Sequence, residues 1–261
     1  MPCETGAATG ASGEEIFYRI WSPDSEPRAA LVLVHGLGEH SGRYEHVAEH
    51  LVARGVVVHA YDHLGHGRSG GRRGWMRGYA DLLDDLQWFH QRAAAHSAGV
   101  PLVLFGHSMG GLIVTTYLLD RAASPDLLVL SSPAIEPVVE EGGRSIDATR
   151  LSKDPVVQES YMTDPLVLRE RVTEELYYGL IDGLAMLPGR AAEISFPTLL
   201  IHGAADAVCS AEGARRYVES FSGGDVTCKL YADGRHEMFN ETNRAEVLDD
   251  LWAWLDERLP A

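Results

Sequence analysis

The stretch Gly106-His107-Ser108-Met109-Gly110-Gly111 decides the fold of this chain. It follows residues 101–105, a short apolar run typical of a buried strand, and precedes residues 112–119, an apolar run compatible with a helix. A G-x-S-x-G pattern in that position predicts a tight turn that holds the serine at the end of a sheet, with flanking glycines that leave room for the backbone. A glycine-rich turn with an ordinary capping serine is the alternative, so the remainder of the chain has to decide.

Composition narrows the class of protein. The chain has 261 residues, of which 45% are hydrophobic, enough for one large core with an inserted cap. Lys and Arg number 22 against 38 Asp and Glu, and the net charge of -16 argues against nucleic-acid partners and anionic membranes. Residues 1–13 lack the charged and apolar segments of a signal peptide, and no apolar run approaches the ~20 residues that span a bilayer. We therefore expect a soluble cytoplasmic protein, at most loosely peripheral to a membrane.

Strand-like and helix-like segments alternate along the chain, which predicts the α/β class with a mostly parallel central sheet flanked by helices. Residues 14–21 alternate loosely and predict an edge strand. The regular alternation stops after Pro133, and residues 133–190 are rich in Glu, Asp, Arg and Pro, with helical fragments around Ser160 and over 169–184. The expected organisation is a core of residues 1–132 and 191–261 with a cap of residues 133–190. Buried strands are expected at 29–34, 56–61 and 196–201, further strands at 126–131 and 226–231, and helices at 44–54, 81–96, 211–221 and 244–259.

Two motifs suggest a cofactor or a metal, and both are better explained otherwise. Residues 62–70 contain a literal G-x-G-x-x-G, but its glycines do not open a helix, because a helical pattern resumes only near Tyr79. His46 and His50 have the i, i+4 spacing of zinc ligands without the H-E-x-x-H sequence, and an exposed helix face is the better interpretation. We expect neither a cofactor nor a metal site.

The cysteines are few and give no metal-like spacing. Cys3, Cys209 and Cys228 contain no C-x-x-C pair, and their number is odd. We interpret all three as reduced thiols.

A serine nucleophile needs a base, and the base needs a third group that orients it. Asp206 comes just after the strand expected at 196–201, and His236 just after the strand expected at 226–231. The strand at 126–131 ends without a carboxylate, so Asp206 is the preferred acid. Asp233 remains a competitor, although its neighbour Gly234 indicates a turn. The order serine, acid, histidine at successive strand ends predicts Ser108 as nucleophile and His236 as base.

A second glycine-bearing turn follows the strand expected at 29–34. Its sequence is His35-Gly36-Leu37-Gly38, and glycines there let the backbone pass close to Ser108. The backbone N–H groups of Leu37 and Met109 are therefore the candidate oxyanion hole. Simple capping of the next helix by this turn is the alternative.

Three segments together resemble the monoacylglycerol lipases of the serine α/β-hydrolase superfamily, and the resemblance runs nearly end to end. They are residues 35–44 (HGLGEHSGRY), 62–69 (DHLGHGRS) and 106–111 (GHSMGG). The resemblance implies an α/β-hydrolase fold with a cap inserted after the sixth strand, and hydrolysis of monoacylglycerol to a fatty acid and glycerol through an acyl-enzyme, without a cofactor. A broad-specificity carboxylesterase or lysophospholipase on the same scaffold is the alternative. A binding protein without turnover would have no need of a complete triad.

The resemblance also implies substrate-binding residues. Glu39, Arg43, His107 and Tyr161 fall in segments that bind the glycerol hydroxyls in that family, and Cys209 would form a pocket wall rather than act as a nucleophile. Residues 138–144 run directly into Glu, Gly and Arg, where the family usually carries a long apolar helix. The cap is therefore expected to be shortened, with at most weak contact with a membrane and no defined preference for acyl chain length. The oligomeric state has no signal in the sequence.

Overall fold

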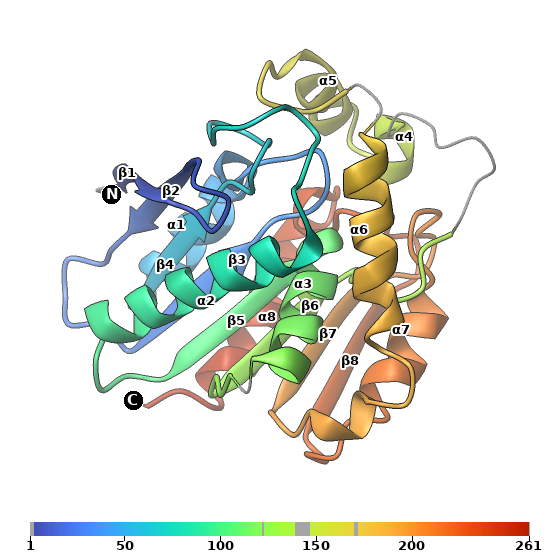
Figure 1. Cartoon of the computed structure of the whole chain (residues 1–261). Coiled ribbons are helices and arrows are strands. Elements are labelled where there is room, and N and C mark those ends of the chain that lie inside the picture. The colour runs from blue at the N-terminus through green and yellow to red at the C-terminus, as the bar shows by residue number, and fades with distance from the viewer. Residues whose placement is uncertain (1–2, 122, 139–146, 170–171, 261) are drawn as a thin grey trace.

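The computed structural model describes residues 3–121, 123–138, 147–169 and 172–260. Within these residues one eight-stranded sheet has the order β1-β2-β4-β3-β5-β6-β7-β8 (Figure 1). The strands from β3 onward are parallel, whereas β2 is antiparallel to both of its neighbours. The strands are β1 (Cys3–Thr9), β2 (Glu15–Trp21), β3 (Ala29–Val34), β4 (Val56–Tyr61), β5 (Leu102–His107), β6 (Leu127–Ser131), β7 (Thr198–Gly203) and β8 (Val226–Tyr231).

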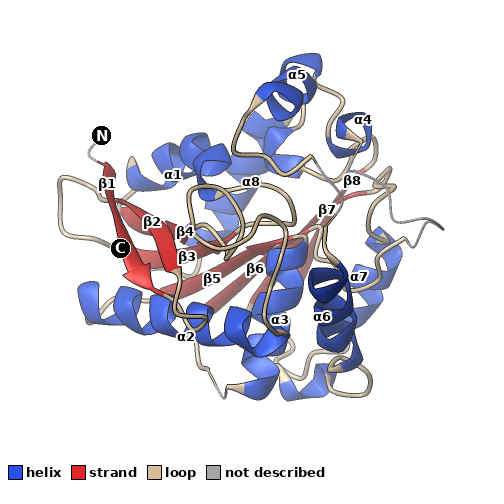
Figure 2. Ribbon diagram, turned by 45° about the horizontal axis from the view of Figure 1, so that its top comes forward, coloured by secondary structure: helices blue, strands red, loops and turns tan. Residues whose placement is uncertain are grey.

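Helices cover both faces of the sheet, as Figure 2 shows. Helices α1 (Glu45–Val52) and α8 (Arg244–Asp256) pack on one face, and α2 (Tyr79–His96), α3 (Met109–Asp120) and α7 (Ala211–Val218) on the other. Because both faces are covered, the central strands β3 to β7 are buried along their whole length and are almost continuously apolar. The predicted α/β-hydrolase fold is confirmed.

Helix α3 differs from the other helices in having almost no polar face. Every residue from Met109 to Leu119 is buried, because the helix lies between the sheet, α2 and α6 (Glu174–Ala185). Thr115 and Thr116 bond back to carbonyls of the preceding turn, which satisfies their hydroxyls within the helix. The helix that follows Ser108 is therefore held on all sides.

Three of the described helices lie between β6 and β7 in the chain: the first two lie beyond the carboxyl ends of the strands, and the third packs against α2 and α3 (Figure 1). They are α4 (Ala148–Leu151), α5 (Pro155–Thr163) and α6. Asp147, Asp154 and Thr173 begin these helices, and each side chain accepts a hydrogen bond from a backbone N–H of the first turn. Residues 139–146, which include most of the segment on which the shortened cap was predicted, lie outside the described residues, and the domain boundaries at 132/133 and 190/191 stay predictions.

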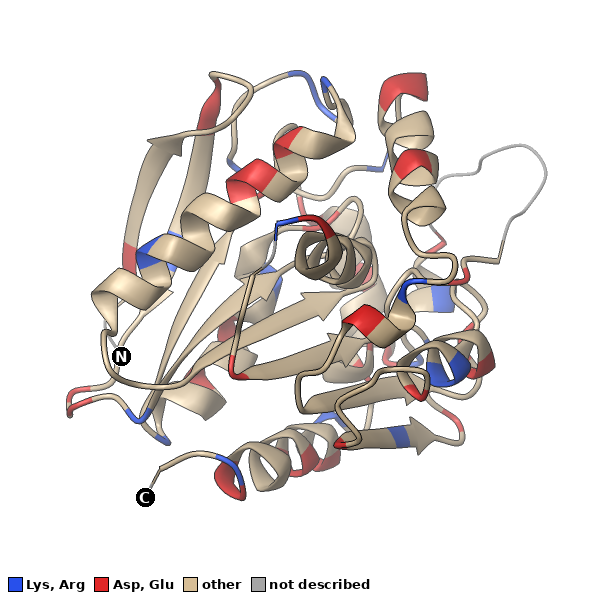
Figure 3. Cartoon of the chain, turned by 60° about the horizontal axis from the view of Figure 1, so that its bottom comes forward, with Lys and Arg blue, Asp and Glu red and all other residues tan. Residues whose placement is uncertain are grey.

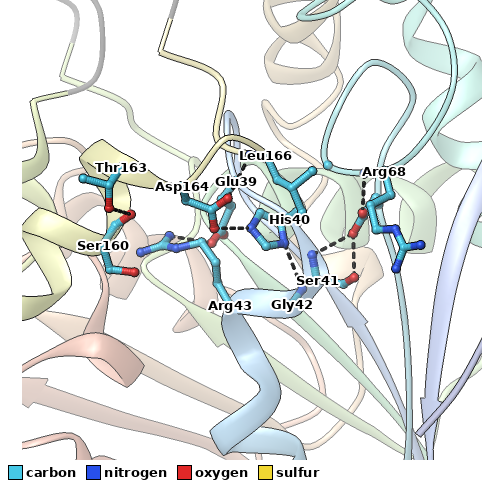
Figure 4. Close-up of polar contacts among 12 residues, drawn as sticks. Glu39, His40, Ser41, Gly42, Arg43, Arg68, Ser160, Thr163, Asp164 and Leu166 are labelled. Atoms are coloured by element: carbon cyan, nitrogen blue, oxygen red, sulfur yellow. Dashed lines mark hydrogen bonds and ion pairs between the residues drawn. The ribbon is translucent and has the colours of Figure 1, made fainter.

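The segment after α5 is tied to the short helix η1 (Ser41–Tyr44), as Figure 4 shows. His40 Nε2 lies 2.9 Å from Asp164 Oδ2, and the backbone N–H of Leu168 donates to the carbonyl of Gly38 at 2.7 Å. On the other side of η1, Asp62 accepts from the backbone N–H and the hydroxyl of Ser41. These bonds join the cap to the loop that follows β3.

The amino-terminal prediction was wrong in one respect. Residues 14–21 were predicted as an edge strand, but β2 (Glu15–Trp21) is not at the edge, because β1 pairs along its outer side. The sequence of β1 is small and polar, and its residues stay largely exposed, so it has no periodicity that marks a strand. Its pairing depends on the turn at 10–13, where Gly13 has a φ of 89°.

The predictions for the glycine-rich segment 62–70 and for His46 can be compared with the structure. Residues 62–78 form a loop and α2 begins at Tyr79, so the prediction that the glycines at 65–70 do not open a helix is confirmed. His46 is half-buried rather than exposed, because its Nε2 bonds the carbonyl of Phe239.

Asp and Glu positions are spread over the outer helices and are not gathered in one band (Figure 3). Among the described helices none is long and apolar enough to cross a bilayer.

Candidate active site

Ser108 lies in a strained turn between β5 and α3. Its φ of 52° and ψ of -119° are unusual for a residue with a side chain and cost on the order of 1–3 kcal/mol. The turn fits because its glycines are in close contact with the backbone: a Cβ on Gly110 would lie 2.0 Å from the carbonyl oxygen of Val34, and one on Gly106 2.6 Å from that of Gly110. The Ser108 N–H donates to the carbonyl of Ser131 on β6, which ties the turn to the sheet.

A chain of hydrogen bonds connects Ser108 to two residues from later strands. Ser108 Oγ lies 2.8 Å from His236 Nε2, and His236 Nδ1 lies 2.8 Å from Asp206 Oδ2. An ionised carboxylate can only accept, so Nδ1 carries the proton and Nε2 is left to accept from the serine hydroxyl. The structure thus brings together the three residues predicted from chain order. Asp233 is exposed in the turn after β8.

Asp206 is held as an anion by its surroundings. Burial by itself would raise the pKa of this carboxyl, but the attraction of His236 and hydrogen bonds from two histidines lower the pKa below its usual range. Oδ1 accepts the backbone N–H groups of Val208 and Cys209 at 2.7 and 3.1 Å. The second histidine is His202 of β7, whose Nε2 lies 2.9 Å from the same Oδ2. Sequence reasoning gave His202 no role.

The candidate oxyanion hole lies where the loop after β3 meets the turn of Ser108. A Cβ on Gly36 would lie 3.1 Å from the Cβ of Ser108, so the backbone of this loop runs against the serine. Leu37 and Met109 both line the pocket at Ser108. Met109 is also the first residue of α3, where the helix presents unpaired N–H groups and the positive end of its dipole.

A cavity of about 190 Å³ opens above Ser108. Most of its wall is apolar, and one part carries the polar side chains of Glu39, His107, Tyr161 and Glu237. Such a pocket suits a ligand with a hydrocarbon part and a small polar part. Ten residues with apolar side chains or a thiol form the apolar part of the wall: Leu37, Met109, Leu112, Ala134, Pro137, Leu151, Leu180, Leu184, Val208 and Cys209.

Two buried carboxylates of this pocket share one guanidinium. Arg43 Nη1 lies 2.8 Å from Glu39 and 2.6 Å from Glu237, and Nη2 makes a second bond of 2.6 Å to Glu237. Burial raises the pKa of Glu39, whereas Arg43 holds the pKa of Glu237 below its usual value despite burial. Arg43 is not among the residues that line the cavity, so its clearest contribution is to neutralise and hold these two carboxylates. Glu237 was missed in the sequence, although it directly follows His236.

The remaining substrate-binding candidates do line the cavity. Tyr161 packs its ring 4.9 Å from the Arg43 guanidinium, and its buried hydroxyl makes no hydrogen bond within the part of the chain that the structure describes. His107 lies beside His236 with ring centroids 4.9 Å apart, and burial lowers its pKa to about 3, so it is neutral at pH 7. A buried hydroxyl without a partner, on a residue that lines a pocket, is a candidate partner for a ligand hydroxyl.

Metal chemistry has no obvious site in these residues. Over the described ranges no three His, Cys, Asp or Glu side chains converge in a way that could hold a metal ion. All three cysteines are free thiols.

The mostly parallel sheet, the strained serine turn and the Ser-His-Asp hydrogen bonds define a serine hydrolase with the α/β-hydrolase fold. The family model described as "Serine aminopeptidase, S33" matches residues 25–243. A monoacylglycerol lipase of Mycolicibacterium smegmatis is 35% identical over 268 residues, 96% of each chain. The monoglyceride lipase of Mus musculus is 30% identical over 96% of this chain and 90% of its own.

A solved structure agrees with these relatives. The crystal structure of the Paleococcus ferrophilus monoacylglycerol lipase superposes with a TM-score of 0.83 at 31% identity, covering 94% of this chain and 99% of that one. The chain belongs to the monoacylglycerol lipase family of serine hydrolases.

Proposed function

We propose that this protein hydrolyses monoacylglycerols to a free fatty acid and glycerol, with Ser108 as the nucleophile. The observation that carries the proposal is the pair of 2.8 Å contacts from Ser108 to His236 and from His236 to Asp206, at the base of a pocket with an apolar wall and a polar end. Similarity to monoacylglycerol lipases over nearly the whole chain supports the choice of substrate.

Each residue has a defined step in this proposal. Ser108 Oγ attacks the ester carbonyl while His236 Nε2 takes its proton, and the N–H groups of Leu37 and Met109 stabilise the oxyanion. His236 then returns the proton to the departing glycerol oxygen, which leaves an acyl-serine. Water attacks this ester while His236 takes its proton, and His236 then returns the proton to Ser108 Oγ as the acyl–oxygen bond breaks and the fatty acid departs. Asp206 orients the imidazole and stabilises its cation.

The polar end of the pocket gives a physical reason for a glycerol leaving group. Glycerol hydroxyls both donate and accept, and the Tyr161 hydroxyl has no hydrogen-bond partner among the described residues. Glu39 and His107 also face the cavity, whereas Arg43 contributes by neutralising and fixing Glu39 and Glu237. A site of this kind leaves its own polar groups unpaired when the leaving alcohol has no hydroxyl.

The description of the family model raises peptide hydrolysis as another activity. An aminopeptidase needs a carboxylate that binds the substrate ammonium group. Glu39 and Glu237, the carboxylates that line this cavity among the described residues, are both already bonded to Arg43. The geometry therefore favours an ester with a neutral polar alcohol.

The test compares a monoacylglycerol with the methyl ester of the same acid. Loss of a buried hydrogen bond costs about 1–3 kcal/mol, so kcat/KM for the methyl ester should be lower by roughly tenfold or more. Tyr161→Phe should lower kcat/KM for the monoacylglycerol and leave the methyl ester nearly unchanged. Tyr177→Phe, on an exposed tyrosine of α6, is the matched control. Equal rates for both esters in the wild type would replace this proposal with a broad carboxylesterase, and a lysophospholipid in the same panel would show the other alternative.

We also propose that the protein is cytoplasmic and that its cap makes only weak contact with a lipid surface. The support is a set of exposed apolar side chains on α5 and α6, including Val156, Met162 and Tyr178. Co-sedimentation with zwitterionic phosphatidylcholine vesicles should detect binding that Tyr178→Glu reduces. No sedimentation of the wild type, or equal sedimentation of both, would contradict the contact.

A further inference from the structure

The acid of the proposed triad is shared between two histidines. Asp206 Oδ2 accepts from His236 Nδ1 at 2.8 Å and from His202 Nε2 at 2.9 Å. His202 is the residue before the last on β7 and is completely buried, so this bond is shielded from water. A hydrogen bond that ends on the oxygen facing the base must influence how strongly that oxygen attracts the base.

The proton on His202 can be placed from its neighbours. Asp206 can only accept, so His202 donates through Nε2–H. Its Nδ1 makes no hydrogen bond to any described residue, which suits the bare nitrogen of a neutral imidazole. His202 therefore withdraws part of the negative charge of Asp206 without adding a full positive charge.

We propose that His202 is a positioning residue, which fixes the Asp206 carboxylate and moderates its pull on His236. With Oδ1 held by the N–H groups of Val208 and Cys209, the donation from His202 removes the last rotational freedom of the carboxylate. It also weakens the hydrogen bond that stabilises protonated His236. The base is then unprotonated over a wider pH range, which a serine mechanism requires in the resting enzyme.

Other groups near the pair do not replace this bond. Glu237 is engaged by Arg43, and His107 is neutral because burial lowers its pKa to about 3. Among the described residues, the titratable side chains that interact with the Asp206–His236 pair, besides His202, are His107 at the end of β5, Glu237 beside His236 and Cys209 of the acid loop. Two nearby cations are bonded elsewhere: Arg43 of η1 bonds Glu237, and Arg150 of α4 bonds the carbonyl of Ala207. Of the hydrogen bonds described at Asp206, those from His202 and His236 are the ones that side chains donate.

The inference rests on the proposed triad, and its test uses a p-nitrophenyl butyrate assay, which does not depend on the natural alcohol. His202→Phe keeps the shape and removes the donor, whereas His202→Gln keeps an N–H at the end of a side chain of similar length. We expect the Phe variant to lose about tenfold in kcat/KM. The acidic limb of its pH profile, where the base becomes protonated, should move to higher pH by roughly half a unit to one unit. The Gln variant should recover the midpoint and most of the rate.

Controls separate this role from a structural one. His59→Phe removes another buried histidine from a central strand, β4, and should leave the midpoint unchanged. If His202→Phe does not fold, His202→Asn, whose amide is too short to reach Oδ2, should shift the midpoint where Gln does not. If the midpoint of the acidic limb in the Phe or Asn variant equals that of the wild type, the inference about His202 is overturned, whereas the proposed triad is not. A wild-type protein that neither hydrolyses the ester nor reacts with a fluorophosphonate would overturn both.

Discussion

At the scale of single residues, Asp206 is the most constrained side chain of the proposed site. It accepts bonds from His202, His236 and the N–H groups of Val208 and Cys209, and its side chain is fully buried. An ionised carboxylate in that position must be fully hydrogen-bonded, because burial of an unpaired charge would be very unfavourable. The orientation of the imidazole thus depends on one carboxylate with no freedom to rotate.

Removing the nucleophile or changing the acid should abolish most turnover. We expect Ser108→Ala to lower kcat by on the order of 10⁴-fold or more, because the covalent route disappears. Asp206→Asn should cost about as much, since an amide favours the wrong histidine tautomer. Steady-state hydrolysis of a monoacylglycerol measures both. Asp233→Asn is the matched control, and a larger loss there than in Asp206→Asn would reassign the acid.

Cys209 should respond to thiol reagents without taking part in catalysis. It lines the cavity, and burial raises the pKa of its thiol well above the usual value, so it is a poor nucleophile. A bulky maleimide that does reach it should block the pocket. Cys209→Ala should keep most activity and lose this inhibition, which a time course of inactivation would show. A folded but inactive Cys209→Ala protein would be evidence against a role as a pocket wall.

For single residues, the sequence predicted the triad residues, which follow strands, better than it predicted which side chains contact one another in the pocket. Ser108, Asp206 and His236 could be selected because residue type and chain order are visible in one dimension. The same reasoning could not reveal that Arg43 lies behind the carboxylates of Glu39 and Glu237, since that depends on which side of η1 faces the cavity. Functional roles of these residues stay predictions until the variants are measured.

At the scale of elements, the turn of Ser108 is built against the end of β3. We expect Gly110→Ala to destabilise the protein by about 3 kcal/mol and to reduce turnover, because its Cβ would lie 2.0 Å from the carbonyl of Val34. Thermal unfolding and kcat together measure the effect. Gly78→Ala is the control, because a Cβ there would meet nothing within 4 Å. If Gly110→Ala left the melting temperature and kcat unchanged, the turn would have room for a Cβ at this position.

Strands whose own sequence marks them were predicted well. Strand β1, which depends on pairing with β2, was not predicted. The strands over 29–34 and 56–61 were predicted from apolar runs and appear with those bounds, as does the strand predicted over 226–231. Strand β1 has no such run, and it exists because its backbone pairs with β2 from Cys3 opposite Trp21 to Thr9 opposite Glu15. Pairing of this kind is a tertiary effect that overrides local propensity.

At the scale of the whole molecule, buried histidines should make the fold sensitive to acid. Burial lowers the pKa of His35, and lowers the pKa of His59 and His63 to about 3. Below about pH 6.5 the unfolded chain therefore binds protons that the folded chain does not. This contribution to stability is complete above that pH and is lost as the pH falls. Raised pKa values of Glu39 and, to about 6, of Asp85 act in the opposite direction but are fewer.

The expected free energy of unfolding decreases from pH 7 to pH 5 by more than about 1.4 kcal/mol per pH unit, the slope for one proton. Urea denaturation at several pH values measures this slope. His59→Leu should reduce it, because His59 is buried without a partner for its Nε2 among the residues described. Stability that is flat or rises over this range would show that the histidines are protonated in the folded protein.

The burial of α3 on all sides also sets the order in which parts of the molecule exchange deuterium. Its amides have no exposed side and should exchange only when the whole protein unfolds, whereas those of α5, with exposed Val156 and Met162, should exchange through local opening. Mass spectrometry of peptic fragments in D₂O should therefore find uptake over α5 long before uptake over α3, and equal rates would contradict this. Ser108 directly precedes the helix that is expected to open last, so local opening of α5 should leave the nucleophile in place.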